Sequence, residues 1–456
     1  MVFNSDIFLF AFLPIVFALF WTLKSKQGRY ILLTVSGYVF YGYWDWRFCF
    51  LMLFSSLVSF IAGMNIDRAS DTRVKRAWMI GTIIVDLSLL GFFKYFNFFA
   101  DTVHALVPGV APPVLDIILP IGISFYTFHT ISYVVDVAAG RVRATHNLFE
   151  YLTYVSLFSQ LVAGPIVRFR QIEEDLERID KHPQQDEMAL GVGFFAVGLI
   201  KKVVVADSIA RFVDPMLANY ETLSVTGAWL AALGYTFQLY YDFSGYSDMA
   251  IGLGYLFGIR IPQNFNQPYQ ALGIGDFWRR WHISLSSWLR DYLYISLGGN
   301  RKGPTRTNIN LMLVMLIGGL WHGANWTFVV WGGYQGLLLV LDRELAPWLK
   351  RLPPLLYRWG TFLMVVFGWV VFRAESLPMA LDWLGKMFGI GAGPEGGPRT
   401  LAALCILCFV AVNTMPETWD FRFPKQIRWA PLYAAALVFA YLFMNGAQTT
   451  FLYYQF

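Results

Sequence analysis

The stretch Leu311-Met-Leu-Val-Met-Leu-Ile-Gly-Gly-Leu-Trp-His322-Gly-Ala-Asn-Trp326 places an imidazole at the end of a long apolar run. Ionisable side chains at membrane depth are costly, and most of them serve a function. The glycines on both sides of His322 predict that the helix breaks there, and irregular backbone at this depth must be buried in protein or border water. A histidine in a wet cavity can take a proton from a hydroxyl near neutral pH. His322 is therefore the first candidate for a catalytic base, with a packed core imidazole as the alternative.

The composition of the whole chain supports a membrane setting. Of its 456 residues, 57% are hydrophobic, 18% are aromatic and only 14% are charged, whereas soluble domains carry roughly a quarter of charged residues. The 17 Trp and 24 Tyr residues suit the two membrane interfaces. We predict an all-α polytopic membrane protein. The net charge of +5 fits basic cytoplasmic loops, so lipid is an expected partner and nucleic acid is not. Cys405 and Cys408 lack further Cys or His nearby, and no metal site is expected.

The order of apolar runs and charged loops predicts a topology. Met1 to Leu23 is apolar without a small-residue cleavage site, which favours a retained first span. Basic residues follow in the loops 24–29 and 67–76, whereas the loop 101–113 contains no Lys or Arg. By the positive-inside rule the N-terminus lies outside, in the periplasm if the cell is bacterial.

The apolar runs predict about 11–13 transmembrane or re-entrant helices around a central funnel. The short runs gather around residues 264–341, and several are below the roughly 20 residues that a bilayer requires. We expect one membrane domain, 1–456, with a catalytic core at about 115–345 and peripheral helices at 1–100 and 355–456. Beyond the four runs that end near residue 100, spans are expected near 115–138, 148–166, 188–215, 226–258, 309–321, 325–341, 355–372, 398–414 and 430–447. The charged stretch 167–187 is expected to lie on the membrane surface, with a docking surface as the alternative.

Two acids interrupt one of the apolar runs. Asp242 and Asp248 are six residues apart, so a regular helix would turn them to different sides. Either the helix breaks at Ser244-Gly245 or the two acids have separate partners. Both remain candidate site residues, and ion pairing with an arginine is the structural alternative.

The segment from Asp276 to Tyr292 is too polar to cross lipid. It combines tryptophans with several cationic or potentially cationic side chains, and a helix would align His282, Ser286 and Arg290, which stand four residues apart. Such a stripe suits a water-filled groove, and arginine forks at a cytoplasmic mouth can bind phosphates of a nucleotide-like donor. Interfacial anchoring is the alternative. The candidates in this segment are Trp278, Arg279, Arg280, Trp281, His282, Ser286 and Arg290.

These motifs resemble the membrane-bound O-acyltransferase family, and within it the bacterial branch that O-acetylates alginate. The resemblance extends over about residues 1–375. It rests on the segments 119–129, 163–165, 241–254, 264–269, 278–301 and 318–325. It implies that His322 is the family's catalytic histidine and that His282 is the second site residue. His129 also lies in an apolar run and is a weaker candidate, with a packed role as the alternative.

The resemblance also implies the reaction. An acyl group from a cytoplasmic thioester, expected to be acetyl-CoA, would pass to a hydroxyl on the other side of a bacterial inner membrane. A thioester is already activated, so no cofactor or metal is expected; a base and an oxyanion stabiliser are required. Asn325, or backbone amides at the glycine break, are candidate oxyanion donors. The expected acceptor is an exported polysaccharide, with alginate as the first candidate. We also expect a periplasmic partner protein that resembles SGNH hydrolases or carries the acyl group.

Other functions remain open at this point. A D-alanyl exporter for teichoic acids and a peptidoglycan O-acetylation protein would carry nearly the same motifs. A proton-coupled transporter, in which the buried histidines and acids relay protons, is the alternative from a different class; inverted repeats would favour it, and the sequence contains none that we detect.

Overall fold

The computed structural model describes residues 1–107, 109, 113, 115–162, 164–181 and 185–444. Regular structure in these residues is helical, without any strand. The predicted all-α class is confirmed. The chain divides into two compact units, one of residues 1–195, 247–262 and 423–430, the other of residues 196–246, 263–422 and 431–456. The expected single membrane domain with a core at 115–345 stays a prediction.

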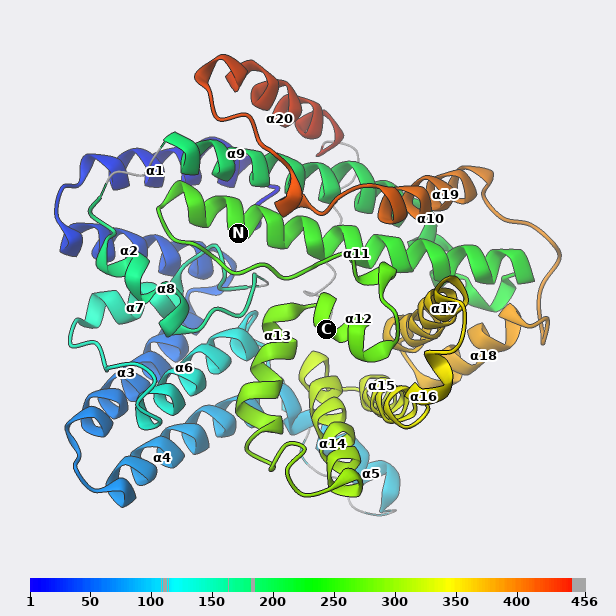
Figure 1. Ribbon diagram of the computed structural model, residues 1–456, viewed down its shortest axis with the longest axis horizontal. Helices are drawn as coiled ribbons and strands as arrows, with labels where there is room; N and C mark the ends of the chain where they lie inside the picture. Colours follow the sequence, from blue (N-terminus) through cyan, green and yellow to red (C-terminus); the bar gives the residue numbers. More distant parts are fainter. Residues whose placement is uncertain (108, 110–112, 114, 163, 182–184, 445–456) are drawn as a thin grey trace. The chain divides into compact units, whose positions relative to one another are not determined.

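The first unit contains the N-terminal helices (Figure 1). Side chains cap several of them: Ser25 accepts from the Gly28 amide at the start of α2, and Asn147 accepts from Phe149 at the start of α7, so the first backbone donors of these helices are satisfied. The helices are η1 Phe8–Phe12, α1 Leu13–Thr22, α2 Lys26–Asp45, α3 Arg47–Arg68, α4 Thr72–Leu90, η2 Gly91–Tyr95, α5 Phe96–Leu106, α6 Ile123–Ala138, α7 Leu148–Ser156, α8 Phe169–Glu177 and most of α9 Gln185–Ile200. The short η8 Ile427–Trp429 also belongs to this unit.

Two spans predicted in this unit are shorter than expected. The predicted span 115–138 becomes helical only at Ile123, because Gly122 adopts a left-handed φ of 78° and lies close to the Leu161 carbonyl. The predicted span 148–166 ends as a helix at Ser156. There the side-chain Nε2 of Gln160 donates to the Tyr154 carbonyl at 2.6 Å, which satisfies a carbonyl of the last turn. Residue 163 lies outside the described residues.

The second unit contains the helices that surround His322. They are η3 Lys201–Ala206, α10 Asp207–Ala218, η4 Tyr220–Thr222, the first part of α11 Val225–Leu256, η5 Pro268–Gln270, α12 Ile274–Arg280, α13 Ile283–Trp288, η6 Leu289–Tyr294, α14 Pro304–His322, α15 Trp326–Glu344, α16 Ala346–Leu349, α17 Pro354–Arg373, α18 Leu377–Met387, α19 Arg399–Thr414, η7 Thr418–Asp420 and α20 Ala430–Met444. The sequence did not predict α18, a short helix that begins where Ser376 caps it.

Helices α14 and α15 form an antiparallel hairpin that carries His322 at its turn (Figure 1). A Cβ on Gly319 would lie 2.3 Å from the Phe328 carbonyl oxygen, and one on Gly332 would lie 2.4 Å from that of Met315. The prediction of a break at Gly318-Gly319 is therefore wrong: these glycines let two backbones approach closely. The break after the histidine is confirmed, since α14 ends at His322 and Gly323 is extended.

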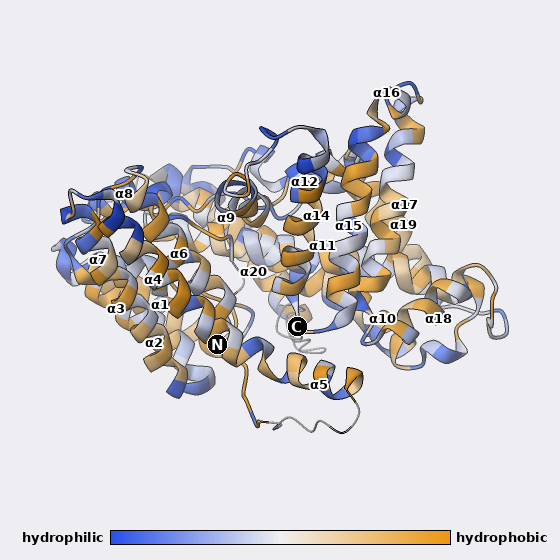
Figure 2. Ribbon diagram, turned by 90° about the horizontal axis from the view of Figure 1, so that it is seen from below, coloured by the Kyte–Doolittle hydropathy of each residue, from blue (hydrophilic) through white to orange (hydrophobic). Residues whose placement is uncertain are grey.

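Four helical stretches among the described residues are long and apolar enough to cross a membrane: Arg47–Arg68, Thr72–Leu106, Asp186–Ala218 and Pro354–Arg373. Hydrophobic residues run along the helices of both units, and hydrophilic ones gather at loops and helix ends (Figure 2). The segment 274–294 differs from these spans, because its three helices have only seven, six and six residues. It positions the site.

Candidate functional site

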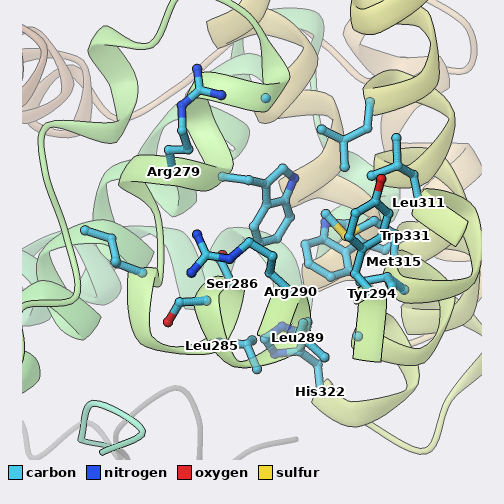
Figure 3. Close-up of a pocket in the computed structure, with 17 residues that line it drawn as sticks. Arg279, Leu285, Ser286, Leu289, Arg290, Tyr294, Leu311, Met315, His322 and Trp331 are labelled. Carbon is cyan, nitrogen blue, oxygen red and sulfur yellow. The ribbon is translucent and has the colours of Figure 1, made fainter. Parts of the chain in front are cut away.

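A cavity of about 360 Å³ lies in the second unit between the short helices α12 to η6 and the hairpin α14–α15 (Figure 3). His322 stands at one end of the labelled set and Arg279 at the other. The lining residues are Gly275, Trp278, Arg279, Ile283, Leu285, Ser286, Ser287, Leu289, Arg290, Tyr294, Leu311, Val314, Met315, Gly318, His322, Trp331 and Leu339.

His322 is enclosed by aromatic rings. Its ring centroid lies 5.0 Å from that of Trp321 and 5.2 Å from those of Trp331 and Phe372, all in edge-to-face geometry. The residue is 6% exposed and is the last residue of α14. An imidazole at the floor of a largely apolar pocket is shielded from bulk water, which strengthens its interactions with a bound substrate.

Two cationic side chains line the pocket, Arg279 at the end away from His322 and Arg290 between the two ends. The Arg279 and Arg290 side chains are 72% and 64% exposed. Arg279 is 3.4 Å from Asp276, whereas Arg290 pairs with Asp291 at 2.7 Å. Guanidinium groups with this exposure retain donors for an incoming anion.

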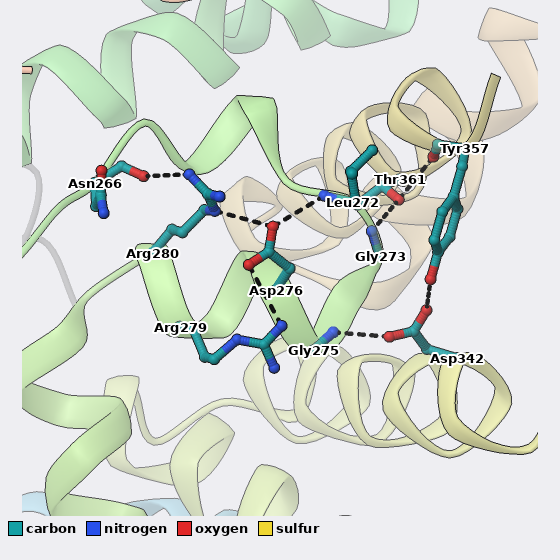
Figure 4. A network of polar contacts seen from close by, with 10 residues as sticks. All are labelled: Asn266, Leu272, Gly273, Gly275, Asp276, Arg279, Arg280, Asp342, Tyr357 and Thr361. Atoms are coloured by element: carbon teal, nitrogen blue, oxygen red, sulfur yellow. Dashed lines mark hydrogen bonds and ion pairs between the residues drawn. The ribbon is translucent and has the colours of Figure 1, made fainter. Parts of the chain in front are cut away.

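The helix that presents Trp278 and Arg279 is held at its N-terminus by acids (Figure 4). The Asp276 carboxylate accepts from the Leu272 amide at 3.1 Å and from Arg280 at 2.9 Å. Asp342 of α15 accepts from the Gly275 amide at 3.0 Å and from the Tyr357 hydroxyl of α17. These contacts fix the start of α12, and with it the direction in which its side chains enter the pocket.

The packing at Gly273 explains why a glycine stands before this helix. Its φ is 93°, and a Cβ there would lie 2.2 Å from the Tyr357 hydroxyl oxygen and 2.6 Å from Asp342 Oδ1. Its amide donates to Thr361 at 3.0 Å. Only glycine combines this left-handed backbone with so close an approach.

The structure brings together five of the residues that the sequence singled out and separates the others from them. Trp278, Arg279, Ser286, Arg290 and His322 all line the pocket. Arg280 and Trp281 do not: Arg280 pairs with Asp276, and Trp281 is buried against Trp369, with ring centroids 4.8 Å apart. Asn325 caps α15 by accepting from the Thr327 amide, and its own amide donates to the Glu375 carbonyl.

His282 lies beside the pocket rather than in it. It precedes α13 with a left-handed φ of 44° and is fully buried. Its Nδ1 is 3.2 Å from Asn264 Oδ1, which also accepts from the Ser284 amide and hydroxyl. Burial lowers the pKa of His282 to about 3, so the imidazole is neutral. The predicted helical alignment of His282 with Ser286 and Arg290 is therefore wrong. His282 lies in the turn before α13, whereas Ser286 and Arg290 line the pocket.

Asp242 has a structural partner. Helix α11 runs unbroken through Ser244-Gly245, so the alternative of a break there is wrong. Lys202 Nζ lies 2.7 Å from Asp242 and 2.6 Å from Asp207, and each of these three residues is at most 4% exposed. We call this set the Lys202 cluster. The partner is thus a lysine rather than the arginine that the sequence suggested. Asp248 is also buried, but falls in the first unit.

His129 belongs to the first unit as well. It is fully buried in α6, and its ring lies 5.5 Å from that of Tyr154. Neither the cavity at His322 nor its lining includes it.

Several pocket residues were missed by the sequence reasoning. Ser287 and Leu289 lie on the segment already singled out and Tyr294 lies two residues beyond it; helical spacing around Ser286 and Arg290 could have indicated all three. Asp342 and Tyr357 act through α12 from distant helices, and no local signal marks them. No group of three or more His, Cys, Asp or Glu residues in the described part of the chain could hold a metal ion.

The sequence was then compared with known proteins. Residues 46–380 match the model of MBOAT, the membrane-bound O-acyltransferase family. The chain is 48% identical over 402 residues to the probable alginate O-acetylase AlgI of Pseudomonas aeruginosa, covering 86% of this chain and 75% of that one. It is 38% identical over 423 residues to the peptidoglycan O-acetyltransferase of Helicobacter pylori, covering 86% and 80%.

A more distant relative has another acyl group in its name. The teichoic acid D-alanyltransferase of Bacillus subtilis is 29% identical over 275 residues, covering 56% of this chain and 69% of that one. The family match spans the pocket and both helices of the His322 hairpin. An imidazole at the floor of a pocket in a helical membrane protein suits acyl transfer to a hydroxyl. Because the family model and these relatives also match, the chain belongs to the membrane-bound O-acyltransferase family and is an O-acyltransferase.

Proposed function

We propose that this protein takes an acetyl group from cytoplasmic acetyl-CoA for the O-acetylation of an exported polysaccharide, with alginate as the first candidate. The observation that carries the proposal is one pocket with His322 at one end, the exposed guanidinium group of Arg279 at the other and that of Arg290 between them. The relatives' names support acetyl as the acyl group and a cell-surface polymer as the acceptor. Peptidoglycan is the second candidate acceptor, favoured by the Helicobacter relative.

The proposed step needs a base and no prior activation of the donor. His322 takes the proton of the acceptor hydroxyl while the hydroxyl oxygen attacks the thioester carbonyl carbon. The carbon–sulfur bond then breaks, and the proton passes from the imidazolium to the leaving thiolate, so that an ester and a free thiol result. Backbone amides that follow His322 are the candidate donors to the oxyanion, because the Asn325 side chain already caps α15 and binds Glu375.

The charge around the pocket supports an anionic donor. Between Asp276 and Arg358 the sequence has ten Lys or Arg and four Asp or Glu, so the excess of six positive charges there exceeds the +5 of the whole chain. An electropositive mouth raises the local concentration of a polyanion and accelerates its association. The same basic loops are those that the positive-inside rule assigns to the cytoplasm.

The two histidines have different proposed tasks. His322 contacts the reacting atoms. His282 is proposed as a positioning residue, since its ring lies 6.2 Å from that of Trp321, which in turn packs on His322 at 5.0 Å. His282→Gln should therefore lower the rate less than His322→Gln does.

The proposal also covers the location of the protein and its partner. The protein lies in a bacterial inner membrane with its N-terminus in the periplasm, and the acceptor reaches the site from the outside. A periplasmic partner, related to SGNH hydrolases or carrying the acyl group, finishes the transfer.

Transfer of radiolabelled acetyl from acetyl-CoA to alginate, in inverted membrane vesicles that contain the protein and its export machinery, tests this proposal. Label in the polymer that depends on His322 is the expected result. Label that appears equally in vesicles with His322→Gln, or none with the wild-type chain, would overturn it.

A further inference from the structure

We infer that the inner end of the pocket selects a small, uncharged acyl group, and that Leu289 opposite Gly318 sets the length limit. This inference rests on the proposed function and deepens it, because it assigns the part of the pocket that discriminates among acyl donors.

The limit arises from the contact between η6 and α14. A Cβ on Gly318 would lie 3.3 Å from Leu289 Cδ1, so little space separates the two. Gly318 precedes His322 by four residues and therefore shares its helix face. Leu289 is 6% exposed and lines the pocket beside Leu285, near His322 (Figure 3). The Leu289 methyl thus stands against the helical turn that carries His322.

Aromatic rings restrict the space around His322 as well. The rings of Trp321, Trp331 and Phe372 surround His322 within 5.2 Å, and buried rings in a packed interior yield little to an added methylene. A hydrophobic site of this kind discriminates against one methylene by about 10-fold or more.

The charge of the lining decides between acyl and aminoacyl groups. No Asp or Glu lines the described pocket, whereas two arginines do. An ammonium group brought to the inner end would lose its hydration without gaining a carboxylate partner, which is costly in an apolar site. An aminoacyl thioester, the class that a D-alanyl transfer would use, is therefore a poor donor.

The length limit is tested with acetyl-, propionyl- and butyryl-CoA as donors in the same inverted membrane vesicles, with the polymer as acceptor. Leu289→Ala should raise the ratio of butyryl to acetyl kcat/KM by about tenfold or more. Leu311→Ala is the matched control: it removes the same side chain from the same pocket, eleven residues or roughly 16 Å along α14 from His322. It can alter all donors alike but should leave the ratio unchanged. Gly318→Ala, which adds a methyl facing Leu289, should shift the ratio toward acetyl.

The charge rule is tested with a pair of equal size. Propionyl-CoA and glycyl-CoA carry acyl groups with the same number of heavy atoms, but only glycyl bears an ammonium. Wild type should use propionyl-CoA at least about tenfold better, as expected when a buried charge has no partner. Equal use of the two would overturn the charge rule.

Competition binding with non-hydrolysable thioether analogues of the same donors separates this inference from the proposed function. Selection by length and charge in binding, without any acetyl transfer, would support the inference and overturn the function. Acetyl transfer with butyryl used equally well, and a ratio that Leu289→Ala leaves unchanged, would overturn the inference and leave the function standing.

Discussion

Two groups of buried polar side chains lie in the second unit of this protein, and they differ in what surrounds them. The Lys202 cluster consists of one lysine between two aspartates, and the lysine Nζ lies 2.6–2.7 Å from both carboxylates. His322 lies among rings of Trp321, Trp331 and Phe372 and opens on a cavity of about 360 Å³. In the sequence both appear as costly polar residues in apolar runs.

The comparison of the Lys202 cluster with His322 indicates how a structural polar group differs from a reactive one. The charges of the Lys202 cluster are buried and paired with one another, so we assign them to the stability of the helix arrangement. A π-helical turn at Lys201–Ala206 lets Lys202 reach both acids. His322 lines a cavity that a substrate can enter, so we assign it to the chemistry. The following variants test whether the Lys202 cluster acts on stability and His322 on the reaction.

The largest effect is expected at His322. His322→Gln keeps a similar shape without the basicity, and the rate of acetyl transfer should fall by about 10²–10⁴-fold. The measurement is acetyl release from acetyl-CoA to polymer at equal amounts of membrane-inserted protein. His146→Gln, an exposed histidine of the first unit, is the matched control and should behave as wild type. Near wild-type transfer by His322→Gln would remove the base from the mechanism.

Lys202→Met should act on stability rather than on chemistry. It leaves two buried carboxylates without their cation, which costs about 3–5 kcal/mol, and the thermal unfolding midpoint in detergent should fall accordingly. The KM for acetyl-CoA of the remaining folded protein should not change.

The matching neutral variant sharpens this test. Lys202→Met combined with Asp207→Asn and Asp242→Asn removes all three charges and should recover most of the lost stability. A folded Lys202→Met protein of normal stability that no longer transfers acetyl would instead make the cluster part of the site.

A smaller effect, on the KM for acetyl-CoA, is expected at the two exposed arginines that line the pocket. Replacing Arg279 and Arg290 with Gln should raise the KM for acetyl-CoA a few-fold to about tenfold with kcat little changed, because exposed charges contribute modestly to binding. The KM of the wild type should rise with salt and that of the double variant much less. Arg73→Gln, at an exposed position in the first turn of α4 in the first unit, serves as control. A lower kcat with an unchanged KM would place these arginines outside donor binding.

The smallest effect on the KM for acetyl-CoA is expected at the hydrogen bonds that hold the start of α12. Asp342→Asn weakens the hydrogen bonds from Gly275 and Tyr357, a loss of about 1 kcal/mol, and should raise the KM for acetyl-CoA slightly through misplacement of Trp278 and Arg279. Tyr357→Phe should do the same. The double variant should be little worse than either single one, since both act through one contact. Fully additive effects would argue against a shared clamp.

The sequence predicted much of this arrangement. The helical class and the boundaries of most long helices were expected from apolar runs and polar interruptions. Five predicted site residues line one pocket, and their roles stay predictions: Trp278, Arg279, Ser286, Arg290 and His322. These features are local, so a single stretch of chain reveals them.

The rest depended on contacts between distant segments. The turn at His282 follows from its bond to Asn264, eighteen residues away, and the pairing of Asp242 depends on Lys202, forty residues away. Gly318-Gly319 appeared as a helix break, although Gly319 allows α15 to approach. Glycine in a helix has either meaning, and only the neighbouring backbone distinguishes them.

The most direct test of the central claim is an experimental structure of the protein with a non-hydrolysable thioether analogue of acetyl-CoA. The account predicts density for the analogue along the pocket. Its phosphates should lie at Arg279 and Arg290, its acetyl-like group should end against the Leu289 side chain, and its carbonyl should contact His322. Density for the bound analogue elsewhere, with the pocket at His322 empty, would contradict it.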